Sequence, residues 1–295
     1  MSIKLFLATC LSLFLIGCSE KAHKTDYGTY LGGEIVNPTS NFVVLRKNDM
    51  LVDTIRLDQN NRFLYEIQDP EKGLYQIFHN EGQIIYLEPN DSIMLRVNTY
   101  EFDETLTFSG YGAPQNNLMV ELFLKNEHEN ELMLQEEIYQ QDPETFNRSI
   151  ASLKQERQAL VDDFFKKNTS DNYFEKIANT IVNYDFYARK EVYPMSHFGV
   201  DRVTFLESLP KSFYDYREEV DFNDASLLEL YSYQRFLINY FNQAAFKDYY
   251  KQEAYDPLSF THNLHKLRLI ETEVDNDSVE SFLLTRTIRD YLANS

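Results

Sequence analysis

The sequence predicts an α+β protein, with an N-terminal antiparallel β-sandwich followed by an all-α helical domain. Residues 28–110 form short runs of β-branched and aromatic residues, separated by turns rich in Asn, Asp, Pro and Gly. After residue 114 glycine almost disappears, Gly199 being the single example, and apolar residues recur at helical spacing. We therefore expect a β-sandwich domain over 28–110 and a helical domain over 114–295.

The first 17 residues have the pattern of a signal peptide. Lys4 supplies a positive charge, and residues 5–16 form an apolar run. This run is shorter than the roughly 20 apolar residues that a membrane-spanning helix needs. We therefore expect residues 1–17 to be removed during export.

The segment Leu15-Ile16-Gly17-Cys18 resembles the lipobox of bacterial lipoproteins. This resemblance implies cleavage after Gly17, diacylglycerol on the Cys18 thiol and a fatty acyl chain on the new amino group, which together anchor the chain to a membrane. Residues 18–27 are polar and are expected to form a tether. Because Ser19 is not an aspartate, the expected location is the outer membrane, facing the periplasm. The alternative is an ordinary signal peptide followed by a chance cysteine.

The predicted β-sandwich contains about eight strands. Apolar and polar residues alternate clearly in 51–57 and 93–97, so one face of each strand should pack while the other meets water. The strands are expected at 29–36, 42–46, 50–57, 63–67, 74–78, 83–87, 92–97 and 105–108.

Two stretches of this region carry a family resemblance. Residues 86–93 (YLEPNDSI) and 106–117 (LTFSGYGAPQNN) resemble the N-terminal β-domain of TlpA-like thiol–disulfide oxidoreductase lipoproteins of Bacteroidota. In that family a β-domain of unknown function precedes a helical segment and then a thioredoxin domain. The resemblance covers residues 28–120 well and the helical part loosely, and its motifs are turn and packing motifs.

The sequence departs from this family where the family's chemistry lies. A Cys-x-x-Cys loop carries the redox reaction there, because a thiolate attacks a disulfide and a second thiol resolves the product. The only cysteines here are Cys10 and Cys18, and the chain ends at Ser295, where a thioredoxin domain would begin. We therefore expect no redox catalysis, no internal disulfide and no cysteine-bound zinc in the processed protein.

The second half predicts a series of acidic and aromatic helices. Asp142-Pro143-Glu144 supplies a cap and a first-turn proline, and the helices on either side of it are expected to form an antiparallel hairpin. Eight aromatic residues between 231 and 250 indicate either a helical core or a ligand groove, and core packing is favoured. The helices are expected at about 116–140, 143–167, 171–191, 201–220, 225–247, 257–272 and 277–293.

No residue pattern in the chain predicts a catalytic, metal or cofactor site. His262 and His265 lie three residues apart on an expected helix, where they could present two imidazoles to a metal. Glu271 is the candidate third ligand, but nothing in the sequence places it near the two histidines. Asp275-Asn276-Asp277 is interpreted as a helix cap, because a calcium loop would need a glycine and a distal glutamate that are missing. The pairs Glu136–Glu137 and Asp162–Asp163 are neighbours on helices, so their carboxylates should not face one another.

Composition narrows the classes of partner. The formal net charge of −19 repels nucleic acid, so no nucleic-acid partner is expected. Hydrophobic residues make up 43% of the chain, which is typical of a globular protein. The leading hypothesis is a non-catalytic envelope lipoprotein that binds a peptide, protein or envelope component. The alternative is an accessory or truncated member of a TlpA-like thiol–disulfide system.

The triplets Asp53-Thr54-Ile55, Asp91-Ser92-Ile93 and Asp277-Ser278-Val279 fit a short O-glycosylation pattern, although such triplets also arise by chance.

Overall fold

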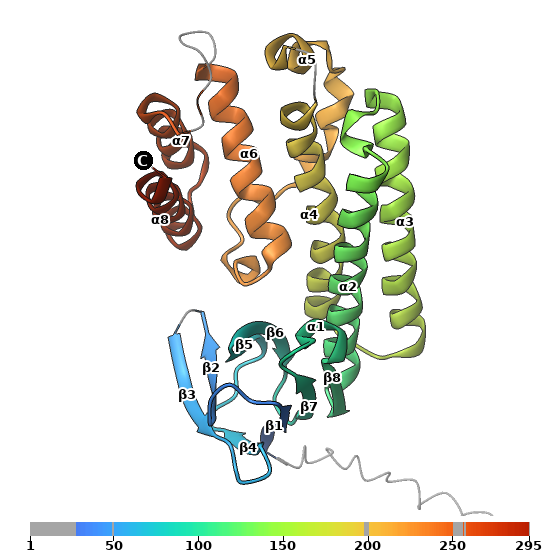
Figure 1. Ribbon diagram of the computed structural model, residues 1–295, viewed down its shortest axis with the longest axis vertical. Helices are drawn as coiled ribbons and strands as arrows, with labels where there is room; N and C mark the ends of the chain where they lie inside the picture. The colour runs from blue at the N-terminus through green and yellow to red at the C-terminus, as the bar shows by residue number, and fades with distance from the viewer. Residues whose placement is uncertain (1–27, 49, 198–200, 250–255, 257, 295) are drawn as a thin grey trace, which may run out of the picture.

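The computed structural model describes residues 28–48, 50–197, 201–249, 256 and 258–294 of the chain. A β-region lies at one end of the molecule and the helices lie at the other (Figure 1), as an α+β fold requires. Cys18 and the rest of the lipobox, together with the expected signal peptide and tether, lie outside the described residues.

The β-region is a sandwich of two four-stranded sheets, with strand orders β4-β1-β7-β8 and β3-β2-β5-β6. All the strand pairs are antiparallel except β1 with β7, which run parallel. The predicted alternation is confirmed in β7, where Ile93, Leu95 and Val97 are buried. In β3 it holds only at Ile55, because Leu51 and Val52 are exposed. The strands are β1 (Thr29–Val36), β2 (Phe42–Lys47), β3 (Met50–Arg56), β4 (Arg62–Ile67), β5 (Gly73–His79), β6 (Glu81–Leu87), β7 (Ser92–Asn98) and β8 (Thr107–Tyr111).

The helices follow the expected order, but several bounds differ. The helix expected to reach residue 140 ends at Gln135 and is followed by a separate 3-10 helix, α4 continues to Ser196, and the short helix α1 was not expected. Instead of one helix over 201–220, the chain forms α5 and then a 3-10 helix, because Pro210 lacks an N–H donor and holds Leu209 in an extended conformation. The helix expected from 225 begins later, at Tyr231. The helices are α1 (Phe102–Thr105), α2 (Ala113–Gln135), η1 (Ile138–Gln140), α3 (Pro143–Lys167), α4 (Asn172–Ser196), α5 (Arg202–Ser208), η2 (Lys211–Glu219), η3 (Ala225–Leu227), α6 (Tyr231–Tyr249), α7 (Phe260–Glu273) and α8 (Asp277–Asn294).

Predicted helix caps are confirmed at both places where the sequence indicated them. The Asp142 carboxylate accepts hydrogen bonds from the N–H groups of Glu144 and Thr145 and so begins α3. Asn276 accepts from the N–H groups of Ser278 and Val279 and begins α8. The stretch Asp275-Asn276-Asp277 is therefore a helix cap.

Helix α2 covers one open side of the sandwich through two adjacent asparagines. The side-chain amide of Asn116 pairs with both the N–H and the C=O of Tyr86 on β6, at 2.8 and 2.9 Å. The amide of Asn117 pairs in the same way with Phe108 on β8, at 2.9 Å for both bonds. Since β6 and β8 are the edge strands of the two sheets, each asparagine satisfies backbone groups that an edge would otherwise leave unpaired.

The segment between the sandwich and α2 is tightly fixed. Gly110 and Gly112 both have positive φ angles, +94° and +91°. A Cβ on Gly110 would lie 2.0 Å from the carbonyl oxygen of Ser92, and one on Gly112 would lie 2.6 Å from the Asp91 carboxyl group. Only glycine fits at these two positions.

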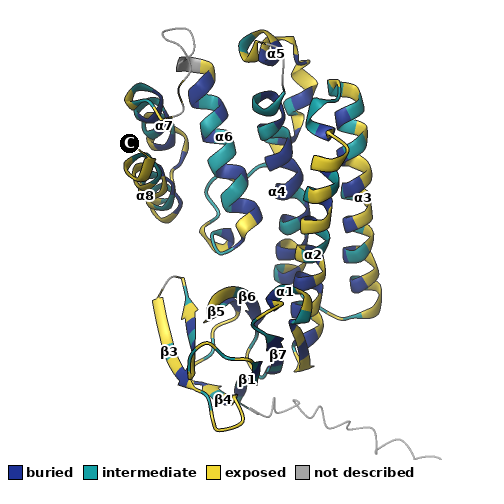
Figure 2. Cartoon of the chain, in the orientation of Figure 1, coloured by how far each residue is buried: buried dark blue, intermediate teal, exposed yellow. Residues whose placement is uncertain are grey.

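Buried residues occur in both the sandwich and the helices (Figure 2), and the two regions share their hydrophobic cores. Ala113 and Val120 of α2 belong to the core of the sandwich. Leu74 and Tyr86, from the outer face of the second sheet, belong to the helical core, where the Tyr86 ring lies 5.0 Å from that of Phe174. The sandwich and the helices are therefore packed together as one body.

Candidate functional site

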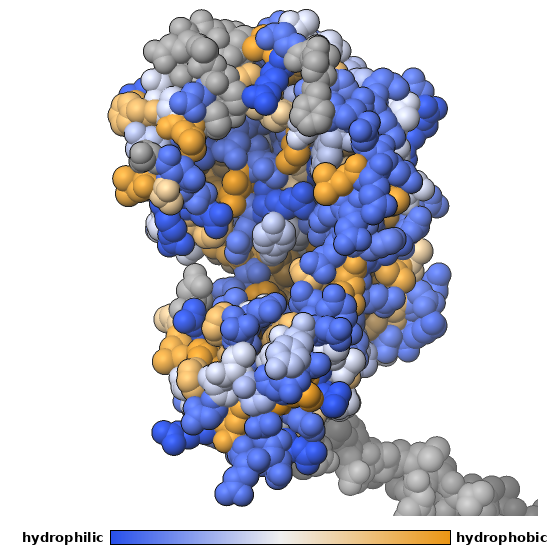
Figure 3. Space-filling model, in the orientation of Figure 1, coloured by the Kyte–Doolittle hydropathy of each residue, from blue (hydrophilic) through white to orange (hydrophobic). Residues whose placement is uncertain are grey.

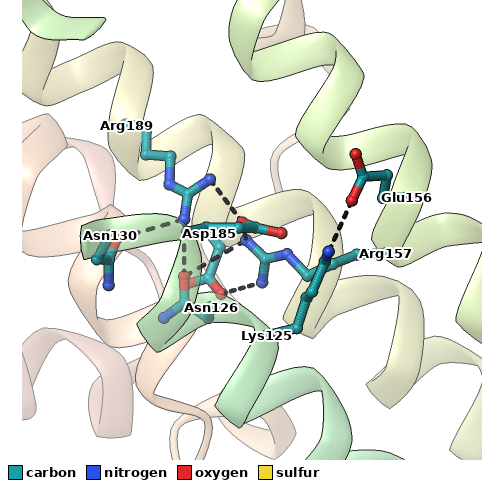
Figure 4. Close-up of polar contacts among 8 residues, drawn as sticks. Lys125, Asn126, Asn130, Glu156, Arg157, Asp185 and Arg189 are labelled. Atoms are coloured by element: carbon teal, nitrogen blue, oxygen red, sulfur yellow. Dashed lines mark hydrogen bonds and ion pairs between the residues drawn. The ribbon is translucent and has the colours of Figure 1, made fainter. Parts of the chain in front are cut away.

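The most strongly buried charges form a network among α2, α3 and α4 (Figure 4). Arg157 makes ion pairs with Asp185 at 2.7 Å and with Glu129 at 3.0 Å. Arg189 makes an ion pair with the same oxygen of Glu129 at 2.8 Å. The Asn126 carbonyl oxygen accepts hydrogen bonds from both guanidinium groups.

This network is sealed from solvent and balanced in charge. Two arginines face two carboxylates, and none of the four side chains is more than 5% exposed. The guanidinium carbons of Arg157 and Arg189 also lie 4.7 and 4.8 Å from the centre of the Phe186 ring. Burial and the neighbouring Arg157 lower the pKa of Arg189. We interpret the network as structural, because a ligand could contact these charges only if the helices separated.

A cleft of about 830 Å³ with converging polar groups lies between the sandwich and the helices. Figure 3 shows the surface hollowed between these two parts, on the left of the view. The sandwich contributes the end of β2 and the start of β5, and the helices contribute the start of α4, the segment 225–234 and one face of α8. The cleft is large enough for a ligand of drug or trisaccharide size.

One face of α8 lines the cleft with polar residues. Ser278, Ser281, Thr285 and Arg289 are spaced three or four residues apart, so they form one stripe along the helix. Val279 and Leu283 are buried and lie on a different face of α8. Helix α8 therefore packs through one face and offers hydroxyl groups and a guanidinium group through another.

Among the residues that the structure describes, more cations than carboxylates line the cleft. The lining cations are Lys47, Lys72, Arg286 and Arg289. Glu71 and Glu229 are the lining carboxylates. Over the whole chain acidic residues outnumber basic ones by 47 to 28, so the charge balance is locally reversed here.

Most of these cations are held in place by carboxylates. Lys72 pairs with Glu88 at 3.1 Å and with Asp171, and the Arg286 Nε lies 2.8 Å from Asp290. These three carboxylates are not part of the cleft lining. Among the residues that the structure describes, Arg289 makes no ion pair within 4.0 Å.

The lysine on the sandwich side of the cleft is held differently. Lys47 pairs with Glu71 at 2.7 Å, and both residues line the cleft. The Lys47 ammonium also lies 4.8 Å from the centre of the Tyr75 ring, which limits its freedom. Lys47 is thus ordered at the rim, with its charge partly neutralised by a carboxylate in the same lining.

The histidines considered as metal ligands do not assemble a site. His262 is buried on α7, and burial, with Lys266 and His265 nearby, lowers its pKa to about 4. His265 is only half-buried. Within the described ranges, no group of three His, Cys, Asp or Glu side chains could hold a metal ion.

The carboxylates of the neighbouring pairs Glu136–Glu137 and Asp162–Asp163 have separate surroundings. Asp162 accepts a hydrogen bond from Gln158, whereas Asp163 pairs with Lys167 at 2.5 Å. Glu137 has a φ of +48° just after the end of α2, which turns it away from the helical path followed up to Gln135. These pairs therefore do not form an acid/base couple.

The aromatic segment of α6 supplies core residues. The described side chains of Tyr233, Phe236, Phe241 and Phe246 are no more than 1% exposed, whereas Tyr231 is 64% exposed. The side chain of Tyr249 and all of Tyr250 lie outside what the structure describes. Core packing, the favoured interpretation, holds for the four buried rings.

Sequence reasoning did not single out the cleft residues, although it placed α8 correctly. A polar stripe at helical spacing is typical of any solvated helix face, so it carries no signal of a cleft by itself. The lining combines five separate stretches of the chain, and only folding brings them together.

Searches for similar proteins give no match to a family model, to a curated protein or to a solved structure. Of the helices that the structure describes, none is both long and apolar enough to cross a membrane.

Proposed function

We propose that this chain is a non-catalytic lipoprotein of the cell envelope, anchored through lipid on Cys18, that binds a ligand in the cleft between its sandwich and its helices. The sequence of the lipobox supports the anchor and, with Ser19, an outer-membrane location facing the periplasm. The observation that carries the binding role is the 830 Å³ cleft, to which both regions of the molecule contribute polar side chains.

The chemistry of the cleft supports binding rather than catalysis. Its lining contains serine and threonine hydroxyls, but no histidine or cysteine. A serine nucleophile needs an adjacent base. Of the two carboxylates among the described lining residues, Glu71 and Glu229, Glu71 is paired with Lys47. The polar groups of the cleft are therefore suited to hydrogen bonding with a ligand.

The anchor is tested by metabolic labelling with an alkyne-bearing fatty acid and partition into a detergent phase. The wild-type chain should carry the label and enter the detergent phase, because several acyl chains on one residue give stable membrane association. The Cys18→Ala variant should carry no label. A wild-type chain that keeps Met1 and has an unmodified Cys18 thiol would contradict the proposed location.

The ligand site is tested by filling the cleft. Ser281 is exposed on α8 and lines the cleft, so Ser281→Trp should block it without disturbing the core. Ser152→Trp, at an exposed position on α3, is the matched control. Native mass spectrometry after incubation with a small-molecule envelope extract should show a bound mass on the wild type and the control, and none on Ser281→Trp. Equal ligand retention by both tryptophan variants would place binding elsewhere.

A further inference from the structure

The cleft that the proposed function uses also carries information about the class of its ligand. Its lining is rich in hydrogen-bond donors, with four cationic side chains and the hydroxyl groups of Ser226, Ser278, Ser281 and Thr285. Among the described lining residues the carboxylates are Glu71 and Glu229, and Glu71 is already paired with Lys47. A donor-rich surface is complementary to a ligand that is rich in acceptors.

The position of the counter-charges strengthens this complementarity. Asp171, Glu88 and Asp290 contact Lys72 and Arg286, but they lie outside the lining. They order the cations and leave the remaining N–H groups of these cations for a ligand. Solvent-exposed ion pairs of this kind are individually weak, so an incoming anion can compete for the cation at small cost.

Arg286 and Arg289 form the centre of this donor surface. Both lie on α8, both line the cleft, and they are three residues apart, so their side chains are neighbours on one face. Arg286 uses its Nε for Asp290, and Arg289 has no ion pair within the described part of the chain. A guanidinium group binds a carboxylate, sulfate or phosphate group through two parallel hydrogen bonds.

We infer that the cleft binds a small ligand with two or more oxyanions, held by Arg286 and Arg289 from α8 and by Lys72 from the sandwich side. This inference rests on the proposed ligand-binding function. It adds that the ligand is anionic, whether its charge comes from carboxylate groups on a saccharide or from phosphate groups. The volume of the cleft, about 830 Å³, accommodates a ligand with several such groups.

An acidic protein needs such a site if it is to bind an anion at all. The net charge of −19 repels anions at long range, so binding depends on local cations at short distance. At about 0.15 M salt the Debye length is about 8 Å, which screens the distant acidic residues more than the contacts within the cleft. Moderate salt should therefore weaken anion binding to this cleft less than it weakens anion binding to a protein whose net charge is positive.

The test uses three defined probes and isothermal titration calorimetry on the soluble chain from residue 19 onward, compared with the full lipidated chain in detergent. Trigalacturonate supplies carboxylates, tripolyphosphate supplies phosphates, and maltotriose is the uncharged counterpart of the saccharide. We expect at least one anionic probe to bind with a Kd below about 1 mM, and maltotriose to bind at least about 10-fold more weakly, as a factor of ten corresponds to the loss of one good contact.

Charge-neutral variants assign the binding to the cleft. Arg286→Gln with Arg289→Gln should raise the Kd of the bound anionic probe by about 10-fold or more, because two guanidinium contacts are lost. Arg148→Gln with Arg268→Gln makes the same change in net charge at exposed positions outside the cleft lining, and should change the Kd by less than about 2-fold. Thermal unfolding of each variant verifies that it is folded.

The outcomes separate this inference from the proposed function. If maltotriose binds as well as trigalacturonate and Ser281→Trp abolishes both, the cleft is a ligand site but the ligand is not selected by charge. If an anionic probe binds and neither Ser281→Trp nor the double arginine variant weakens it, the cleft is not the site. If no anionic probe binds at about 10 mM, the inference is overturned, while the adduct seen by native mass spectrometry still tests the cleft.

Discussion

Arginines and carboxylates form ion pairs both in the network among α2, α3 and α4 and beside the cleft at α8. The two places differ in how far these side chains are buried. In the network, Glu129, Arg157 and Arg189 are no more than 1% exposed, and their charges cancel within the protein. In the cleft, Arg286 is about half exposed, and its carboxylate partner lies outside the lining. Burial therefore decides whether an arginine is part of the fold or is accessible to a ligand.

The same contrast appears between neighbouring residues on single helices. Asn116 is buried and Asn117 is exposed, although each makes the same pair of bonds to an edge strand. The exposed pair Lys125–Glu156 (Figure 4) joins the same two helices, α2 and α3, as the buried pair Glu129–Arg157. The Lys125 Nζ lies 2.6 Å from a Glu156 carboxylate oxygen. These matched pairs allow the effect of burial to be measured while the chemistry stays nearly constant.

The largest effect is expected in the sealed network. Glu129→Met leaves Arg157 and Arg189 with only the Asp185 carboxylate, so the free energy of unfolding should fall by about 3–5 kcal/mol, as for other broken buried ion pairs. Urea denaturation measures the change. The double variant Glu129→Met with Arg189→Met restores the balance of charge, and we expect it to be more stable than Glu129→Met alone. A Glu129→Met variant as stable as the wild type would show that the network contributes nothing to stability.

The second effect concerns the two asparagines that cover the sheet edges. Asn116→Ala leaves the buried N–H and C=O of Tyr86 without their side-chain partner, and should cost about 2–3 kcal/mol. Asn117→Ala exposes the backbone of Phe108 to water, which replaces the lost bonds, so it should cost less than about 1 kcal/mol. Both values come from urea denaturation. Equal costs for the two variants would contradict the role given to burial.

These effects also show how far the sequence predicted the structure. The strands were predicted within one to three residues because alternation and turn residues are local signals. The stretch 106–117 contains Gly110, Gly112 and Asn116, and each of these has a structural role at the junction with α2. The sequence could not show that this junction is fixed, because the groups that surround the glycines come from Ser92 and Asp91, some 20 residues earlier.

The buried network interrupts the apolar stripes of two helices in the sequence. The periodicity of apolar residues alone does not explain these interruptions. In the stripe Phe146, Ile150, Leu153, Leu160 and Phe164, the interior position between Leu153 and Leu160 is taken by Arg157. The stripe of α2 has a similar gap between Leu122 and Leu132, where Asn126 and Glu129 are buried. Two interrupted stripes on adjacent helices indicate a shared buried ion pair, but identifying the partners requires the way in which the helices pack.

A third effect depends on pH and involves the buried carboxyl group of Asp91. Burial raises its pKa to about 6, with the Glu88 carboxylate adding to the rise and the hydrogen bond from the Glu88 N–H opposing it. In the unfolded chain the pKa is about 3.9, so the folded state binds this proton more tightly. The contribution of Asp91 to stability is therefore present at low pH and is lost as the pH rises from about 4 to about 6.

Comparison with Asp91→Asn isolates this effect. We expect the free energy of unfolding of the wild type, relative to that of Asp91→Asn, to fall by about 2 kcal/mol between pH 4 and 7 and to change little above pH 7. Urea denaturation at several pH values measures it. A difference that does not change over this range would mean that Asp91 has the same pKa in the folded and unfolded chain.

The smallest effect is expected for the exposed pair Lys125–Glu156, and it completes the comparison with the sealed network. Lys125→Met removes an ion pair that is open to solvent on both sides, so it should change the free energy of unfolding by less than about 0.5 kcal/mol. Adding about 0.5 M salt to the wild type should have a similarly small effect on this pair. If Lys125→Met instead costs as much as Glu129→Met, the strength of ion pairs between α2 and α3 does not depend on burial. The distinction between structural arginines and the accessible arginines of the cleft would then lose its physical basis.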